Sequence, residues 1–495
     1  MIGSGPNGLV AAATLAQAGW RVRVLEAQPR PGGALYSVES TLPGYLHDVG
    51  AAFFPFAHVS PALQQLRLDE FGLQWRAGVY ESAHPAPDGT CVSIARDIDR
   101  AAQSFGSDGE AWRKLANWQA AMGPRLANAL LAPLPGIRPA LNLGFANLVR
   151  LALAGMSSAA GYSRGLFRSE AARRVIPGLA LHVDLGPEDF SSAALGLVLA
   201  LLAAGGGFQV PVGGALAITD AILKRLAQFG GQMQLNARVD SIVVRKGRAV
   251  AVRTTGGDEI PVAKAILADV GAPALYLRLL PENSVPGWVR QSIHHFRYGW
   301  GTFKMDWALA GPVPWIAEEA RQSAVVHAGD SIDDLIRFTN EARAGQLPTN
   351  PYLVIGQQSL LDPTRAPVGC HTLWAYSRVP SQMPGGWSRC KETFADRIDQ
   401  RIEGLAPGFR ALIRGRAIFA PDDLERMNEN LVGGDLGGGS AQFTQQLFWR
   451  PLFPYFRYRT PVRGVYLCSA STHPGAGVHG ACGYNAARAA LRDLA

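Results

Sequence analysis

The apolar residues at the start of the chain first repeat like a helix and then like a strand. From Leu9 to Ala16 they recur at intervals of three and four residues, which predicts an amphipathic helix. Gly19 follows, and glycine commonly ends a helix because it adopts the left-handed conformation at low cost. Residues 21–26 then read Arg-Val-Arg-Val-Leu-Glu, an alternation that predicts a short strand ending in an acid.

Helical and strand patterns recur later in the chain. A helical face from Ile218 to Leu226 ends at Gly230-Gly231, and the residues from 235 to 253 predict a returning three-stranded β-meander with a turn at Lys246-Gly247. A buried strand is expected at residues 265–268. From about 286 to 455, strand-like runs alternate with loops, and one of these runs includes Lys304.

Helical patterns rich in alanine and leucine dominate from about 80 to 204 and predict a helical cap. The longest apolar run, residues 193–204, falls short of the roughly 20 residues that span a bilayer. We therefore expect it to be a buried core helix.

Three glycines stand immediately before the first predicted helix. Gly3, Gly5 and Gly8 form the pattern G-x-G-x-x-G, in which glycine permits a tight turn, close approach to a pyrophosphate and close packing of helix on strand. Glu26 follows Gly8 by 18 residues, near the spacing of an acid that binds a ribose. The motif predicts a dinucleotide site. Only Met1 and Ile2 precede Gly3, so either the first strand is very short or residues before it are missing.

Composition narrows the functional classes. The 495 residues are 48% hydrophobic and 17% charged, with a net charge of +8. The chain has no dense Lys/Arg run, which argues against nucleic acid; a solvated basic surface and contact with an anionic membrane both stay open. The five cysteines include no C-x-x-C pair, and the ten histidines form no ligand pattern. We expect no redox-active dithiol, no metal and a cytoplasmic location.

The residues after Glu26 resemble those of a known enzyme group. An acid, a Pro/Arg loop and then Gly32-Gly33 resemble the extension in FAD enzymes of the amine-oxidase and phytoene-desaturase type. The resemblance implies that the nucleotide is FAD rather than NAD. The FAD is expected to be non-covalent, because no cysteine or histidine lies in a recognised linkage motif.

The resemblance extends over nearly the whole chain. The chain resembles bacterial phytoene dehydrogenase-like FAD oxidoreductases in three segments. These are the start of the chain, the segment around Val239, and the run L-C-S-A-S-T-H-P-G-A-G-V-H-G from residue 467. The nearest branch is related to pyridine nucleotide-disulfide oxidoreductase domain-containing protein two. The implied fold class is α/β: a Rossmann-like FAD domain of the glutathione-reductase type with a β-meander, plus a discontinuous α+β substrate domain with a helical cap. The FAD domain would comprise residues 1–80, 205–285 and 456–495. The substrate domain would comprise 81–204 and 286–455.

The resemblance also implies a set of FAD-binding residues. Val239 would contact adenine through its backbone, and a helix opening at Gly477 would direct its N–H groups at the N1–C2=O edge of the flavin. Ala34 and Ala470 replace an arginine and an acid of true amine oxidases, and Ser471 is a candidate for the lost polar contact. The full set is Gly3, Gly5, Pro6, Asn7, Gly8, Glu26, Ala27, Gly32, Gly33, Ala34, Gly50, Ala51, Val239, Ala470, Ser471, Gly477, Val478 and His479.

Two residues are candidates for catalysis, Lys304 and His479. In amine-oxidase relatives a lysine entering a similar strand holds a water against flavin N5, and Lys304 looks like that residue. The alternative is a lysine on the solvent face of a strand, balanced by Asp306 two residues later.

The expected function is an FAD-dependent oxidoreductase that dehydrogenates, oxidises or isomerises an apolar organic substrate by hydride transfer to flavin N5. Oxygen, a quinone or another acceptor would reoxidise the flavin. An oxygen-using enzyme of the amine-oxidase kind and a non-catalytic flavoprotein that acts as an interaction partner are the alternatives. Peripheral membrane contact through the apolar cap and a homodimer also stay open.

Overall fold

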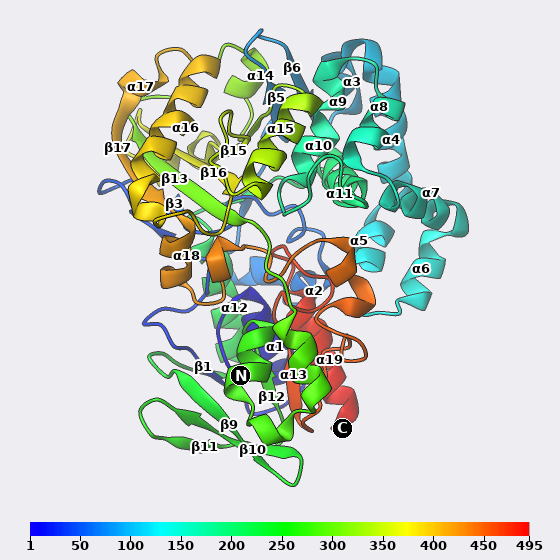
Figure 1. Ribbon diagram of the computed structural model, residues 1–495, viewed down its shortest axis with the longest axis vertical. Coiled ribbons are helices and arrows are strands. Elements are labelled where there is room, and N and C mark those ends of the chain that lie inside the picture. The colour runs from blue at the N-terminus through cyan, green and yellow to red at the C-terminus, as the bar shows by residue number, and fades with distance from the viewer. Residues whose placement is uncertain (495) are drawn as a thin grey trace.

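The computed structural model describes residues 1–494 and places both ends of the chain in the same lobe, the lower one in Figure 1. This lobe holds the glycine motif. Its short parallel strands are β1 (Arg23–Leu25), β8 (Gln232–Gln234), β12 (Ile266–Ala268) and β18 (Val465–Leu467). Strand β1 pairs with β8, and β12 pairs with β18.

The strand before Gly3 is reduced to one bridging residue. Ile2 pairs in parallel with both Leu25 and Ala268, and so joins the two strand pairs into one layer. Helix α1 (Pro6–Gln17) follows, and Gly19 has a φ of +84° beyond its end, as the sequence predicts. Two other helices, α12 (Leu216–Gln228) and α19 (Ala481–Asp493), pack against α1, which is why α1 is buried almost throughout.

The predicted β-meander is present at the far end of this lobe, at the bottom of Figure 1. Its strands β9 (Val239–Arg245), β10 (Arg248–Thr254) and β11 (Glu259–Pro261) are antiparallel. Helix α13 (Gly287–His294) buries Val289 and Ile293 in the same core as the meander, so the chain leaves this lobe only after α13.

The other lobe is built on a seven-stranded sheet with the order β17-β13-β16-β15-β14-β5-β6. Neighbouring strands are antiparallel except for β14 and β5. The bounds are β5 (Ser82–Pro85), β6 (Cys91–Ile94), β13 (Gly301–Leu309), β14 (Val325–Ala328), β15 (Leu353–Gly356), β16 (His371–Val379) and β17 (Ile413–Phe419). Helices α15 (Ile332–Arg343), α16 (Lys391–Leu405) and α18 (Pro421–Met427) accompany the sheet.

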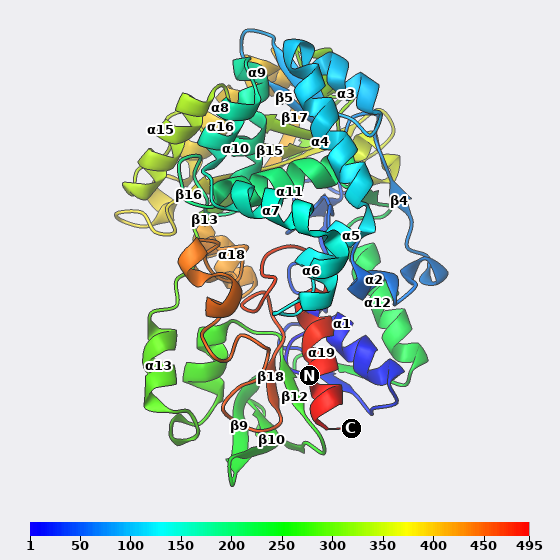
Figure 2. The same cartoon turned by 90° about the vertical axis from the view of Figure 1, so that its right-hand side faces the viewer.

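Helices form a cap beside this sheet, and the cap reaches down toward the nucleotide lobe through α5 and α6 (Figure 2). They are α3 (Ile98–Ser104), α4 (Gly109–Met122), α5 (Pro124–Leu130), α6 (Ile137–Leu143), α7 (Phe145–Gly155), α8 (Ala159–Leu166), α9 (Glu170–Arg173), α10 (Val175–Ala180) and α11 (Ser192–Ala204). Helix α11 contains the longest apolar run and is buried, as expected for a core helix. Among residues 1–494, no helix is both long and apolar enough to cross a bilayer.

Candidate active site

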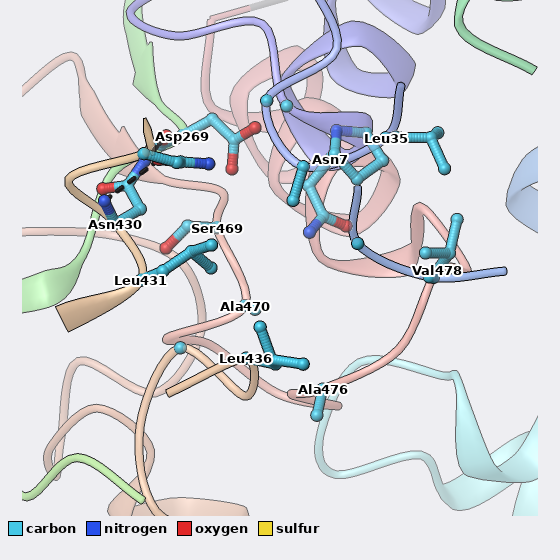
Figure 3. Close-up of a pocket in the computed structure, with 18 of the residues that line it drawn as sticks. Asn7, Leu35, Asp269, Asn430, Leu431, Leu436, Ser469, Ala470, Ala476 and Val478 are labelled. Atoms are coloured by element: carbon cyan, nitrogen blue, oxygen red, sulfur yellow. Dashed lines mark hydrogen bonds between the residues drawn. The ribbon is translucent and has the colours of Figure 1, made fainter. Parts of the chain in front are cut away.

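A cavity of about 530 Å³ lies between the two lobes. Its walls come from the N-terminus of α1, the end of β1, residues 50–56, strand β16, and the loops at 427–438 and 469–478. Figure 3 shows Asp269 and Asn430 on one side of it and Asn7, Leu35 and Val478 on the other. These segments are far apart in sequence and meet only through the fold.

The glycine motif leaves room and hydrogen-bond donors at one end of the cavity. A Cβ on Gly33 would lie 3.0 Å from the Cα of Gly5, so the two loops touch backbone to backbone. Within residues 1–494, the N–H groups of Gly5 and Asn7 find no acceptor, and the buried Asn7 Oδ1 has no partner. Free N–H groups at a helix N-terminus favour an anion.

Glu26 holds the glycine loop in place. Its carboxylate accepts hydrogen bonds from the Ser4 N–H at 2.8 Å, the Ser4 hydroxyl at 2.5 Å and the Gln28 N–H at 2.9 Å. Glu26 also lines the cavity. The acid that follows β1 therefore holds the glycine loop and lines the cavity, and its contact with a ribose stays a prediction.

Asp269 is a second carboxylate at this end, and the sequence analysis missed it. It follows β12 directly, and its Oδ2 accepts a hydrogen bond of 2.8 Å from the Gly8 N–H. Burial raises the pKa of Asp269 to about 7, against the opposing effect of the Gly8 hydrogen bond. The sequence did contain a signal for Asp269, because this acid directly follows the buried strand predicted at residues 265–268.

Most of the predicted FAD-binding residues line this one cavity, while Gly8, Gly32 and His479 stand behind its wall. The residues that line it are Gly3, Gly5, Pro6, Asn7, Glu26, Ala27, Gly33, Ala34, Gly50, Ala51, Val239, Ala470, Ser471, Gly477 and Val478. Ser471 donates to the Gly438 carbonyl at 2.8 Å and accepts from the Ala272 N–H at 3.1 Å.

The prediction of a helix that opens at Gly477 is wrong. Helix α19 begins at Ala481, because Gly477 and Gly480 have φ values of +117° and +64° that interrupt a right-handed helix. His479 lies in the loop between them and is buried. Its Nδ1 accepts from the Ala481 N–H at 3.0 Å, and burial lowers its pKa to about 4. His479 is thus a neutral residue behind Gly477, and its catalytic role stays a prediction.

Lys304 is buried, so the alternative that placed it on the solvent face of a strand is wrong. The same alternative paired Lys304 with Asp306, and that pairing is present. The Lys304 ammonium lies 2.6 Å from both carboxylate oxygens of Asp306. Burial lowers the pKa of Lys304 against the attraction of Asp306. Lys304 does not line the cavity, but in the β13–β16 register it stands opposite Tyr376, which does. Its catalytic role stays a prediction.

The other end of the cavity is apolar and aromatic. Trp374 and Tyr376 from β16 meet edge to face, and Phe53 meets Trp374 in the same way. The apolar lining at this end comprises Phe53, Phe56, Leu195, Leu199, Phe208, Val325, Val354, Trp374 and Tyr376. Sequence reasoning predicted strands here but could not predict which side chains converge.

Two polar groups adjoin this apolar end. Arg378 donates to the Thr302 hydroxyl at 2.7 Å and to the His182 carbonyl. His182 hydrogen-bonds His327 at 2.9 Å, and burial, followed by the nearby Arg378, lowers the pKa of His182 to about 3. Arg378 is therefore the charged group at this end, and His182 is neutral near pH 7.

Several known proteins are similar to this chain. Residues 7–304 match the family described as "Flavin containing amine oxidoreductase". The chain is 32% identical over 303 residues to the rat (Rattus norvegicus) pyridine nucleotide-disulfide oxidoreductase domain-containing protein 2. That match covers 58% of this chain and 52% of the rat protein, so the chain spans about half the length of that relative.

Two further similarities cover nearly all of the chain. A phytoene desaturase (neurosporene-forming) of Rhodobacter capsulatus is 25% identical over 510 residues, which is 97% of this chain and 90% of that enzyme. The crystal structure of an oxidoreductase from Methanosarcina mazei has a TM-score of 0.64 at 14% identity and covers 99% of both chains. At that identity the structural likeness shows the fold alone, and it confirms the predicted fold class.

Proposed function

Since the chain belongs to the flavin-containing amine oxidoreductase family, we propose that it removes hydride from carbon in a neutral, apolar organic substrate. The general activity, FAD-dependent oxidoreduction, follows from the family and from the desaturase relatives. The substrate class is the proposed part. One observation carries it, the distribution of charge along the cavity.

FAD is the cofactor, and the residues present fit it. The free N–H groups of Gly5 and Asn7 suit a diphosphate, and the close contact of Gly33 with Gly5 leaves no room for larger side chains. Glu26 stands where a ribose acceptor is expected. When bound, FAD supplies the hydride acceptor at N5.

The acids that line the cavity are grouped at the nucleotide end. Among the described lining residues they are Glu26, Asp240, Asp269 and Glu429. Glu429 pairs with Arg238, next to Val239, and Asp240 follows Val239. The aromatic end holds the cation Arg378 instead. A protonated amine would meet no carboxylate there and would be repelled by the guanidinium, so this distribution argues against the amine-oxidase alternative.

The side chains at the aromatic end exclude water from the reacting carbon. Trp374, Tyr376 and Phe53 pack edge to face into a wall that an apolar molecule can contact over a large area. The desaturase name of the Rhodobacter capsulatus relative supports the same substrate class. We propose Lys304, opposite Tyr376, as the group that assists proton movement near the ring.

An anaerobic substrate panel tests the proposal. Purified FAD-loaded protein is mixed with apolar alkenes and polyenes in one arm and with primary and secondary amines in the other, and flavin absorbance is followed. We expect bleaching by an apolar compound, with reoxidation by oxygen or a quinone in a second mixing step. Bleaching by amines alone would overturn the substrate class. A flavin that no compound in either arm reduces would favour the non-catalytic alternative.

We further propose that apolar substrate reaches the protein from an anionic membrane surface. Helices α6 and α7 expose three large apolar side chains, here called the ridge: Ile137 is 63% exposed, Leu141 70% and Phe145 83%. Next to it a groove of about 650 Å³ is lined by Arg125, Arg138, Arg488 and Arg492, and its lining residues within 1–494 include no Asp or Glu. Apolar ridge and basic groove together suit a lipid surface with anionic headgroups.

Vesicle flotation decides the membrane proposal. We expect the parent protein to float with vesicles that contain anionic lipid and to remain below neutral vesicles. Phe145→Ser and Arg138→Gln should each reduce flotation, and Val368→Ser, at a fully exposed valine outside the ridge, is the matched control. No flotation on anionic vesicles would remove the membrane proposal. Concentration-dependent self-association lost in Phe145→Ser would assign the ridge to a homodimer instead.

A further inference from the structure

We propose that Asp269 is a proton-binding site coupled to the cofactor site, so that its carboxyl group takes up a proton when the diphosphate of FAD binds. The inference concerns how the protein holds its cofactor and is independent of the substrate class.

The position of Asp269 places it against the expected diphosphate site. Its Oδ2 accepts from the Gly8 N–H, the third glycine of the motif, at 2.8 Å. A Cβ on Gly5 would lie 2.6 Å from the same oxygen, so the carboxyl group lies directly against the loop. Asp269 also lines the cavity, and Figure 3 shows its side chain directed toward the start of α1.

The backbone fixes this carboxyl group in place. The Asp269 N–H donates to the Ile2 carbonyl at 2.8 Å, and the Asp269 carbonyl accepts from the Asn430 side-chain amide at 3.3 Å. The residue is 7% exposed. Burial and the Gly8 hydrogen bond then hold the carboxyl group against the loop, so a second negative group at the helix N-terminus would arrive beside it.

The charges around Asp269 oppose its ionised form. Glu26, on the other side of the glycine loop, is the nearby carboxylate that adds to the effect of burial. The thiols of Cys468, directly after β18, and of Cys482 in α19 lie near it, and burial raises the pKa of both, so both are neutral near pH 7. Arg238 and Arg278 line the cavity but do not hydrogen-bond Asp269, and Arg238 is paired with Glu429.

The direction of the coupling follows from these charges. Burial already holds the pKa of Asp269 at about 7 without a nucleotide. A diphosphate at the α1 N-terminus adds negative charge nearby and raises that pKa further, because like charges disfavour ionisation. Between the two pKa values FAD binding takes up a proton, so affinity is highest below pH 7 and falls as the pH rises.

The test measures FAD affinity and proton uptake. Apoprotein is titrated with FAD, the dissociation constant is read from flavin fluorescence between pH 6 and 9, and calorimetry in buffers of different ionisation enthalpy counts the protons. For the parent we expect the dissociation constant to rise about tenfold per pH unit above about pH 7, with uptake near one proton. Asp269→Asn keeps an acceptor for Gly8 and should bind FAD with little pH dependence and no uptake.

The control is Asp258→Asn, which removes an exposed carboxylate of the same lobe outside the cavity. It should keep the slope of the parent. A parent protein that binds FAD with no proton uptake overturns the inference, and this measurement stands even if Asp269→Asn fails to fold. An Asp269→Asn protein that keeps the slope and the uptake of the parent also overturns it.

Discussion

The two ends of the cavity are built in different ways. At the nucleotide end many contacts come from backbone groups of two short loops close together in sequence, residues 3–8 and 26–34, to which the fold adds Asp269. At the aromatic end they come from side chains on residues as distant as Phe53, Leu199 and Trp374. Backbone contacts to a cofactor do not depend on which side chains are present. Contacts to a substrate through side chains change whenever those side chains change.

Lys304→Met tests the buried ion pair in the sheet beside the aromatic end. It should have the largest effect of these changes on the free energy of unfolding. It leaves the buried Asp306 carboxylate without its cation, which costs about 3–5 kcal/mol of folding free energy. Denaturant unfolding measures this loss. The pair Lys391–Asp423, whose side chains are 27% and 18% exposed, gives the control, where Lys391→Met should cost less than Lys304→Met.

The same variant tests the proposed catalytic role of Lys304. In protein that retains FAD, stopped flow times flavin reduction and reoxidation separately. The role requires that at least one of the two steps be slower than in the parent. Equal rates for both steps would leave Lys304 as a structural partner of Asp306.

Gly8→Ala tests the nucleotide end through the backbone. The added Cβ would lie 2.7 Å from the Gly3 carbonyl oxygen and 2.9 Å from the Asp269 Cβ, so the loop must shift. Overpacking of this kind costs up to about 3 kcal/mol, and FAD affinity should fall by about 100-fold. Gly287→Ala, which meets open space, should bind FAD as the parent does. Unchanged FAD affinity in Gly8→Ala would contradict the assigned site.

Glu26→Ala tests the same end through a side chain. The change removes three hydrogen bonds to Glu26 and an acceptor in the cavity, and FAD binding should weaken by about 1–3 kcal/mol. Fluorescence titration with FAD measures it, and Glu259→Ala on the exposed meander is the control. A Glu26→Ala protein with parental affinity would show that the acid contributes nothing to the cofactor.

Trp374→Ala tests whether the aromatic end affects the substrate without affecting FAD. Loss of part of the wall should lower kcat/KM for the apolar substrate about tenfold, or about 1.4 kcal/mol, while FAD affinity stays within about twofold. Steady-state kinetics and FAD titration are run on the same preparation. If FAD affinity fell as much as kcat/KM, the two ends could not be treated as separate.

Local patterns predicted the parts of the site that depend on local geometry. The glycine motif, the acid after β1 and the Gly32-Gly33 turn act within a few residues of one another, so spacing alone indicates them. The helix expected at Gly477 was wrong because left-handed glycines at 477 and 480 delay its start to Ala481. Lys304 was placed correctly on the face shared with Asp306, but alternation could not tell that Ser40 and His47, more than 250 residues earlier, would pack on that face.

The helix, the strand and the terminal acid follow the glycines in register, and each depends only on nearby residues, so spacing along the chain predicts the nucleotide fold. The positions of the charges in the cavity depend instead on contacts between distant segments. Asp269 reaches Gly8 across 261 residues because β12 lies beside Ile2. Trp374 and Arg378 reach the opposite end because alternate residues of β16 point from one face of the sheet toward the cavity. Such contacts depend on strand order, which hydrophobic periodicity does not encode.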